Sequence, residues 1–397
     1  MPKYRLDINV YEAAKQRIKW TFDSFDKIYL CFSAGKDSTV MLHLAMDEAK
    51  RRNKKIGVLV IDLEAQYKLT IDHLKNCIEE YRDYIDLYWI ALPLKLRNAV
   101  SVYEPSWICW DKDRKNDWVR DLPEKSISDE NYFSFFNKGM EFEEFMFEFG
   151  KWYSDNKKTA CLVGIRTNES LNRFRAIYNL NKKTLDSNLF TTQISENLFN
   201  VYPIYDWETE DIWIYHCNNP EKKYNELYEL MHKAGVPLRH QRICQPYGDE
   251  QKIGLWLFHI VEPETWSKVV NRVSGVNSGA LYIKENNYNN IQKPKNTTWR
   301  EISNLLLNSI PDKTKNHYNN IIDSYVKLWK DRGYPKGIPD EVPGCLEKTG
   351  KVPSWRLITK CILKNDYYMK GLGKSQPKTE MYGLVLKMRK NKNHESI

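Results

Sequence analysis

Short apolar runs alternate with amphipathic segments along the first half of the chain. Runs typical of buried parallel strands occupy 27–33, 56–64, 87–93, 159–165 and 201–204. Apolar positions of 39–52 fall on one helical face, and a second amphipathic helix follows the strand at 56–64. The alternation of strand and helix predicts an α/β fold with a parallel sheet, right-handed crossovers and flanking helices.

Two regions depart from this alternation. Residues 101–153 form an excursion: 101–138 carries three tryptophans among many charges and predicts a long loop, and 141–153 predicts a helix whose aromatic stripe packs in the core. From about 206 onward the pattern is mainly helical, with an Asn-rich loop signature at 271–297. We therefore expect a nucleotide-binding domain over 1–250 and a mainly helical C-terminal domain over 251–397.

The sequence "CFSAGKDSTVMLHLA" (31–45) takes the chain from the first strand directly into a helix. Backbone N–H groups of such a turn and the N-terminus of the following helix face the same point, which favours an anion. Lys36 adds a positive charge, and Ser33 and Ser38 add hydroxyl donors. A helix start capped by Ser or Asp is the structural alternative, and this order of residues after a buried strand makes it the weaker interpretation.

This stretch resembles the PP-loop, commonly S-G-G-K-D-S, of the adenine-nucleotide α-hydrolase-like superfamily, which has a Rossmann-like sheet. The resemblance implies that the loop holds the β,γ-pyrophosphate of ATP, through the residues Ser33, Ala34, Gly35, Lys36, Asp37 and Ser38. Ala34 stands where the family usually has glycine, and alanine tolerates a positive φ less well.

Two further stretches narrow the resemblance. "GIRTNESLNR" (164–173) resembles a motif of phosphoadenosine phosphosulfate (PAPS) reductases and the ATP sulfurylase small subunit. It implies that Gly164, Arg166 and Arg173 belong to the nucleotide site, where guanidinium donors suit phosphate oxygens. "YPIYDWETEDIWIY" (202–215) resembles another element of these families, for which we expect helix capping by its acidic first turn rather than direct ligation by Asp206 and Trp207.

Over nearly its whole length the chain resembles a PAPS-reductase-related family with an additional C-terminal domain of unknown function. The immunoglobulin-binding regulator A (IbrA) co-regulators belong to that family, and its members often pair with a ParB/sulfiredoxin-like protein. Such a protein is therefore an expected partner, and nucleic acid is a further candidate.

The expected reaction is cleavage of ATP between its α- and β-phosphates, with transfer of AMP to an unknown acceptor. The C-terminal Glu-Cys-Gly-type motif of PAPS reductases is absent from the sequence, whereas the Lys36-Asp37 pair is retained, and both observations favour ATP over PAPS. Lys36, Asp37 and Arg173 are the expected catalytic residues. Asp37 and Asp62, which ends the second strand, are candidate Mg²⁺ ligands. For Asp62 a polar strand end is an equal alternative.

Two other reactions or roles stay open. The first is PAPS reduction or another sulfonucleotide reaction, and the second is a non-catalytic, nucleotide-binding transcriptional co-regulator. Arg239, His240 and Arg242 form a basic loop that could clamp substrate and favour the thiolate of Cys244 as a nucleophile. Cys109 is a weaker candidate, because tryptophan neighbours also suit an inert thiol.

Composition limits the classes of ligand and site that the protein is expected to have, but it does not indicate a function. The net charge of +9 suits anionic ligands, although it is modest for 397 residues. None of the eight cysteines forms a C-x-x-C pair, so we expect neither a zinc site nor an iron–sulfur cluster. No apolar run approaches the length of a membrane span, and we expect a cytoplasmic protein with no membrane contact.

Overall fold

The structure is a computed structural model that describes residues 6–179, 181–249, 254–276, 293–294, 296–347 and 352–373. Most of the Asn-rich loop expected at 271–297 lies outside these residues. In the described ranges no helix is both long and apolar enough to cross a membrane.

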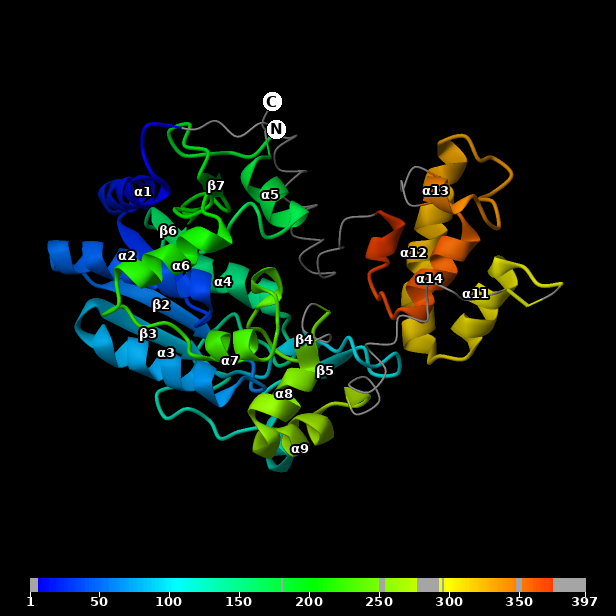
Figure 1. Ribbon diagram of the computed structural model, residues 1–397, viewed down its shortest axis with the longest axis horizontal. Helices are drawn as coiled ribbons and strands as arrows, with labels where there is room; N and C mark the ends of the chain where they lie inside the picture. The colour runs from blue at the N-terminus through cyan, green and yellow to red at the C-terminus, as the bar shows by residue number, and fades with distance from the viewer. Residues whose placement is uncertain are drawn as a thin grey trace.

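A six-stranded sheet forms the centre of the N-terminal part, in the order β3-β2-β1-β6-β8-β7 (Figure 1). Its strands are β1 (Lys27–Cys31), β2 (Ile56–Ile61), β3 (Ile85–Ile90), β6 (Thr159–Leu162), β7 (Thr191–Gln193) and β8 (Leu198–Val201). All neighbouring pairs are parallel except β7 and β8. The predicted parallel sheet is confirmed, and the antiparallel edge strand β7 is an addition to it.

The register of the sheet explains why its strands are continuous apolar runs. Val58, Leu30, Leu162 and Val201 lie side by side across four strands, and each is at most 1% exposed. They belong to a core beneath α1 (Val10–Ser24), α2 (Lys36–Arg52), α3 (Lys68–Glu80) and α6 (Thr209–Asn218). A parallel strand covered by helices on both faces is apolar on both, as observed here.

The opposite face of the sheet packs against α4 (Phe142–Ser154), the aromatic helix of the excursion. Phe145 and Phe149 are fully buried there, which confirms the core role expected for this stripe. Trp152 lies at the edge of the stripe and is 38% exposed. The excursion is therefore packed onto the sheet over much of its length.

The predicted long loop at 101–138 contains regular structure and buried side chains. Within it, β5 (Ser106–Ile108) forms a small antiparallel ladder with β4 (Lys95–Arg97), which precedes the loop, and the 3₁₀ helix η2 (Lys112–Asp117) follows. Trp107, Trp110 and Trp118 are buried. The indole of Trp110 donates to the carbonyl of Asp62 at 2.9 Å, so the excursion is tied to the carboxyl end of β2.

The remaining helices fall into two groups. α5 (Leu171–Ile177) follows β6, and α7 (Leu227–Lys233), α8 (Leu255–Val261) and α9 (Pro263–Arg272) follow β8; side chains of α7, α8 and α9 join the core that contains α4. α11 (Trp299–Asn308), α12 (Asp312–Asp331), α13 (Gly344–Glu347) and α14 (Trp355–Leu363) lie beside the sheet domain and have a separate core (Figure 1).

One contact between the two parts is well defined. The amide of Asn365 donates to the carbonyl of Ala99 at 3.0 Å, and the guanidinium of Arg97 lies 4.4 Å from the ring centre of Tyr367. The segment just before the excursion therefore contacts the helical C-terminal region that the sequence predicts. The boundary placed at residue 250 stays a prediction.

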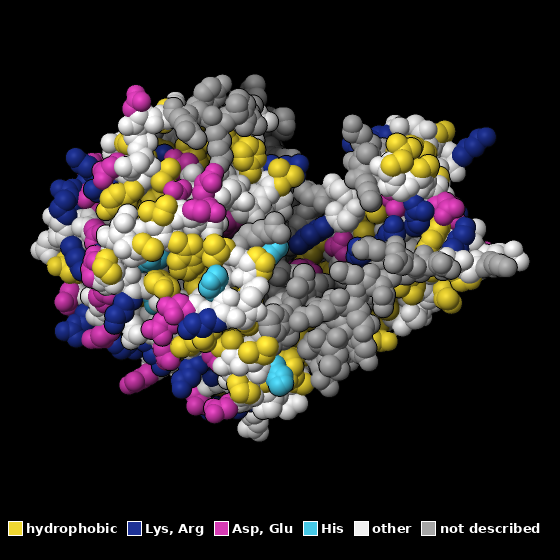
Figure 2. All heavy atoms as spheres, viewed as in Figure 1, with side chains coloured by type: hydrophobic (Ala, Val, Ile, Leu, Met, Phe, Trp, Pro, Cys, Tyr) yellow, Lys and Arg dark blue, Asp and Glu magenta, His cyan; other side chains and the backbone are white. Residues whose placement is uncertain are grey.

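On the face shown in Figure 2, basic and acidic side chains are mixed, and hydrophobic side chains gather over α6. Ile214 of α6 is 55% exposed. This face therefore does not present a surface of one sign to a polyanion such as nucleic acid.

Candidate phosphate-binding site

The chain turns sharply at residues 33–38, between β1 and α2. Ala34 is fully buried and has φ +57°. It therefore adopts the left-handed conformation that alanine tolerates less well than the glycine usual at this position. Its carbonyl accepts a hydrogen bond from the Asn225 amide at 3.2 Å. The turn then places Gly35 at the N-cap of α2, a 17-residue helix whose positive end faces the loop.

Lys36 and Asp37 occupy the first turn of α2 and contact each other. The Lys36 ammonium lies 3.3 Å from a carboxylate oxygen of Asp37 and donates to the backbone carbonyl of Gln241 at 3.1 Å. Lys36 is only 6% exposed, and this burial lowers its pKa although Asp37 opposes the shift. The loop therefore holds a buried positive charge at a helix N-terminus.

The second motif lies directly beside the loop, because β1 and β6 are neighbouring parallel strands. A Cβ atom on Gly164 would lie 3.1 Å from the carbonyl oxygen of Asp37, so glycine allows this close approach. The guanidinium of Arg166 binds the Asp37 carboxylate through Nε and donates to Asn168 Oδ1 at 2.6 Å. The structure thus brings Arg166 to the loop, as the sequence predicts.

Glu169 assembles three arginines around this site. Its carboxylate pairs with Arg173 and lies 3.6 Å from Arg166 Nε, and its backbone carbonyl accepts from Arg242 at 3.0 Å. The structure therefore brings Arg173 and Arg242 into the same region as Lys36. Sequence reasoning missed Glu169, although it stands inside the motif at 164–173.

Asp62 is placed differently from the expected metal ligand. Its fully buried carboxylate accepts from the Trp89 indole and the Glu64 amide, both at 2.9 Å, and pairs with Arg120. These partners suit the alternative of a structural strand end. Among the described residues, no group of three or more His, Cys, Asp or Glu side chains is placed to hold a metal ion. The Mg²⁺ assignment of Asp37 and Asp62 stays a prediction.

The thiols predicted as nucleophiles differ in their surroundings. Cys109 is fully buried, its thiol contacts the Leu92 carbonyl, and burial raises its pKa. Cys244 is partly exposed and follows Gln241, whose carbonyl accepts from Lys36, by three residues. Cys244 therefore belongs to the segment that contacts the phosphate-binding loop, whereas Cys109 is shielded from solvent.

The basic loop at 239–242 is only partly described. His240 is exposed in the 3₁₀ helix η3 (Leu238–His240), and the side chain of Arg239 lies outside the described residues. Arg242 contacts the site through the Glu169 carbonyl, and Gln241 of the same loop contacts Lys36.

The stretch at 202–215 has the structural role expected for it. Glu208 and Asp211 form a capping box at the start of α6, with the Glu208 amide donating to Asp211 at 2.7 Å. Asp206 pairs with Arg17 of α1 at 2.7 Å, and the buried Trp207 donates to the Val10 carbonyl at 3.0 Å. These residues cap α6 and join α1 to the segment that precedes α6.

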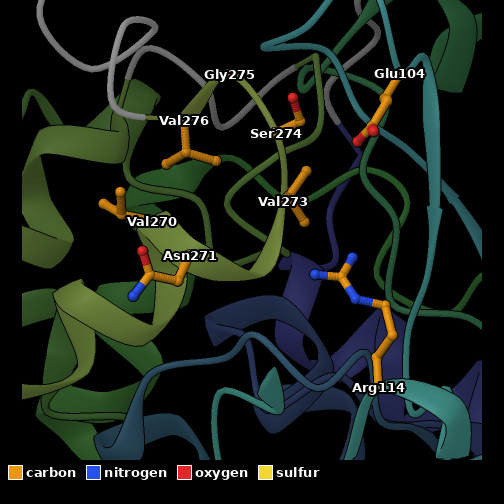
Figure 3. A pocket seen from close by; sticks show the side chains of 8 residues that line it. All are labelled: Glu104, Arg114, Val270, Asn271, Val273, Ser274, Gly275 and Val276. Atoms are coloured by element: carbon orange, nitrogen blue, oxygen red, sulfur yellow. The ribbon is translucent and has the colours of Figure 1, made fainter. Parts of the chain in front are cut away.

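Two cavities in the described residues lie away from the loop. The first, of about 360 Å³, lies between the end of α9 and the excursion, with Arg114 and Glu104 on one side and Val273 and Ser274 on the other (Figure 3). The second, of about 450 Å³, lies beside the start of α3 and Glu262. No residue of 33–38 lines either cavity.

The chain belongs to the phosphoadenosine phosphosulfate reductase domain family, which it matches over residues 27–234. Residues 235–335 match a second family, described as a domain of unknown function (DUF3440). The chain is 42% identical over 400 residues to the uncharacterized protein YbdN of Escherichia coli (strain K12), with 99% of this chain and 97% of that protein covered.

Solved structures with similar folds are much more distant. The chain is 12% identical to PAPS reductase from Candida auris, covering 62% of this chain and 99% of that one at a TM-score of 0.31. It is 14% identical to the U34-tRNA thiolase NcsA from Methanococcus maripaludis, covering 69% and 80% at a TM-score of 0.32. Likeness this distant says nothing of this chain's own activity.

Proposed function

We propose that this protein binds ATP at residues 33–38 and cleaves it between the α- and β-phosphates, so that AMP passes to an acceptor and pyrophosphate leaves. The observation that supports this most strongly is the placement of the buried Lys36 and Arg166 at one helix N-terminus, with Arg173 joined to Arg166 through Glu169. Cations at such a point favour the charge that develops on a pyrophosphate leaving group. Together with the helix N-terminus they suit a polyphosphate better than a neutral ligand.

Each residue has a distinct part in this proposal. The amides of the loop and the Lys36 ammonium would bind the β,γ-pyrophosphate, and the guanidinium groups of Arg166 and Arg173 would bind outer phosphate oxygens. Mg²⁺ would arrive with the nucleotide, held mainly by phosphate oxygens, as is usual for this ion. Asp37 is the carboxylate best placed to contact it.

The experiment is incubation of the protein with α-labelled ATP, Mg²⁺ and candidate acceptors. AMP or an adenylated product is expected from the wild type and not from Lys36→Met. Lys55→Met, at an exposed position before β2, is the matched control and should keep full turnover. Tight ATP binding without turnover would contradict the proposed enzymatic activity and favour the non-catalytic, nucleotide-binding co-regulator.

Sulfonucleotide reduction is the second candidate, since the family is named for it and Cys244 follows Gln241, which contacts Lys36, by three residues. Its test is consumption of PAPS with thioredoxin as reductant, compared between the wild type and Cys244→Ser. Consumption that depends on Cys244 would replace the ATP proposal. The ParB/sulfiredoxin-like partner and a nucleic-acid acceptor remain proposals, to be tested by adding each to the ATP assay.

A further inference from the structure

The anion-binding donors of the loop have partners within the protein itself. The backbone amide of Lys36 donates to the Tyr228 hydroxyl at 3.0 Å, and its ammonium donates to the Gln241 carbonyl at 3.1 Å. The guanidinium of Arg166 is held by Asp37. Oxygen atoms of the protein thus stand where the proposed function requires phosphate oxygens.

Two of these contacts, those of Tyr228 and Gln241, come from one segment, residues 225–242, which we call the strap. It begins with Asn225, whose amide donates to the Ala34 carbonyl, and reaches the site again through Tyr228 and Gln241. It ends at Arg242, which donates to the carbonyl of Glu169. The strap therefore contacts both sequence motifs of the site.

The strap is packed tightly on the loop. Asn225, Tyr228 and Gln241 are all at most 3% exposed, and the side chain of Gln241 donates back to the Val236 carbonyl at 2.9 Å. The Lys36 ammonium also lies 5.4 Å from the ring centre of Tyr228. Atoms this close to Lys36 leave no room for a phosphate group on the same donors.

The strap offers the loop neutral acceptors, whereas a polyphosphate offers charged ones. Hydrogen bonds to ionised acceptors are roughly twice as strong as those between neutral groups. A polyphosphate would therefore compete successfully for Lys36 and displace the Tyr228 hydroxyl and the Gln241 carbonyl. Gly235, with φ +78° and open space around its Cα, lies within the strap where the chain must turn.

We propose that the strap closes the phosphate-binding loop while it is empty, and that binding of a di- or triphosphate requires Tyr228 and Gln241 to withdraw. This inference rests on the proposed function, because it takes the loop as the phosphate site. It extends that function by making the strap a competitor of the ligand, so that access to the site is regulated by the segment after the sheet.

The first test needs no ligand. Amide hydrogen exchange of His240 and Gln241, which donate to Pro237 and Leu238, is compared between the wild type and Lys36→Met. Loss of the Lys36 contact should speed this exchange about 2- to 10-fold, the range expected for one hydrogen bond. Lys55→Met should leave it unchanged. Equal exchange in Lys36→Met and the wild type would overturn the closure.

The second test is titration with inorganic pyrophosphate. Tyr228→Phe keeps the ring and removes the competing hydroxyl, so it should bind pyrophosphate about 2- to 10-fold more tightly than the wild type. Tyr224→Phe, which removes a surface hydroxyl bonded to Glu229, is the matched control and should bind as the wild type does. Equal or weaker binding by Tyr228→Phe would contradict the proposal that the strap competes with the ligand.

The two tests separate the two proposals. A wild type that binds no pyrophosphate contradicts the proposed function, while the exchange comparison still decides whether Lys36 holds the strap. Exchange could be faster in Lys36→Met while Tyr228→Phe binds pyrophosphate no more tightly than the wild type. That result would support the phosphate site and contradict its closure by the strap.

Discussion

Replacement of Arg272 by methionine should destabilise the sheet domain strongly. Arg272 Nε lies 2.6 Å from Glu64 Oε1, and both side chains are at most 1% exposed. The Glu64 carboxylate also accepts from the Trp110 and Val119 amides, at 2.7 and 3.2 Å. Arg272→Met leaves this carboxylate buried with neutral donors alone. Breaking a buried pair in this way costs about 3–5 kcal/mol of unfolding free energy.

The assay for this prediction is thermal unfolding followed by circular dichroism. A loss of that size lowers the Tm of a domain of 150–250 residues by roughly 10 °C. Arg82→Met, which breaks the exposed Arg82–Glu79 pair, is the control and should change stability by less than about 1 kcal/mol. The double variant Glu64→Gln/Arg272→Met should recover more than half of the loss, because the buried charge is gone. An Arg272→Met variant as stable as the control would refute this reasoning.

Three further predictions concern the loop, the neighbouring glycine and two buried histidines. Ala34→Gly should raise the unfolding free energy by up to about 1 kcal/mol in a urea titration, since glycine adopts φ +57° without strain; a loss of stability would contradict it. Gly164→Ala should cost about 1–3 kcal/mol and weaken nucleotide binding, because its Cβ would meet the Asp37 backbone; unchanged values would contradict it. Burial lowers the pKa of His43 to about 3 and of His73 to about 4. The unfolded chain therefore takes up protons first as the pH falls below about 6.5, and stability that is complete above that value should decrease by up to about 1.4 kcal/mol per pH unit for each histidine. Urea midpoints that stay equal between pH 7 and pH 5 would contradict this account.

The sheet could be predicted because its buried strands are continuous apolar runs with polar ends. Strand β7 could not, because Thr191–Gln193 has no apolar run and forms only by pairing with β8. Residues 101–138 of the excursion were predicted as a loop for a similar reason. Its buried tryptophans are held by partners distant in sequence, such as Asp62 for Trp110.

The candidate site also contains residues that the sequence could predict and residues that it could not. Lys36 and Arg166 could be predicted, since each lies in a compact motif at the end of a strand, and parallel neighbours bring their carboxyl ends together. Gln241 contacts Lys36 through its backbone carbonyl, which every residue has, so the sequence carries no signal for it. For Asp62 the sequence left a metal ligand and a polar strand end as equal alternatives. Its partner Arg120 comes from the excursion, whose path no sequence pattern indicated.

The central claim is that residues 33–38 bind the β- and γ-phosphates of ATP. Equilibrium titration of the wild type and Lys36→Met with ATP and with AMP tests it most directly. The wild type should bind ATP at least about tenfold more tightly than AMP, a difference of about 1.4 kcal/mol, and Lys36→Met should lose this preference. Equal affinities of the wild type for ATP and AMP, or a preference that survives in Lys36→Met, would contradict the claim.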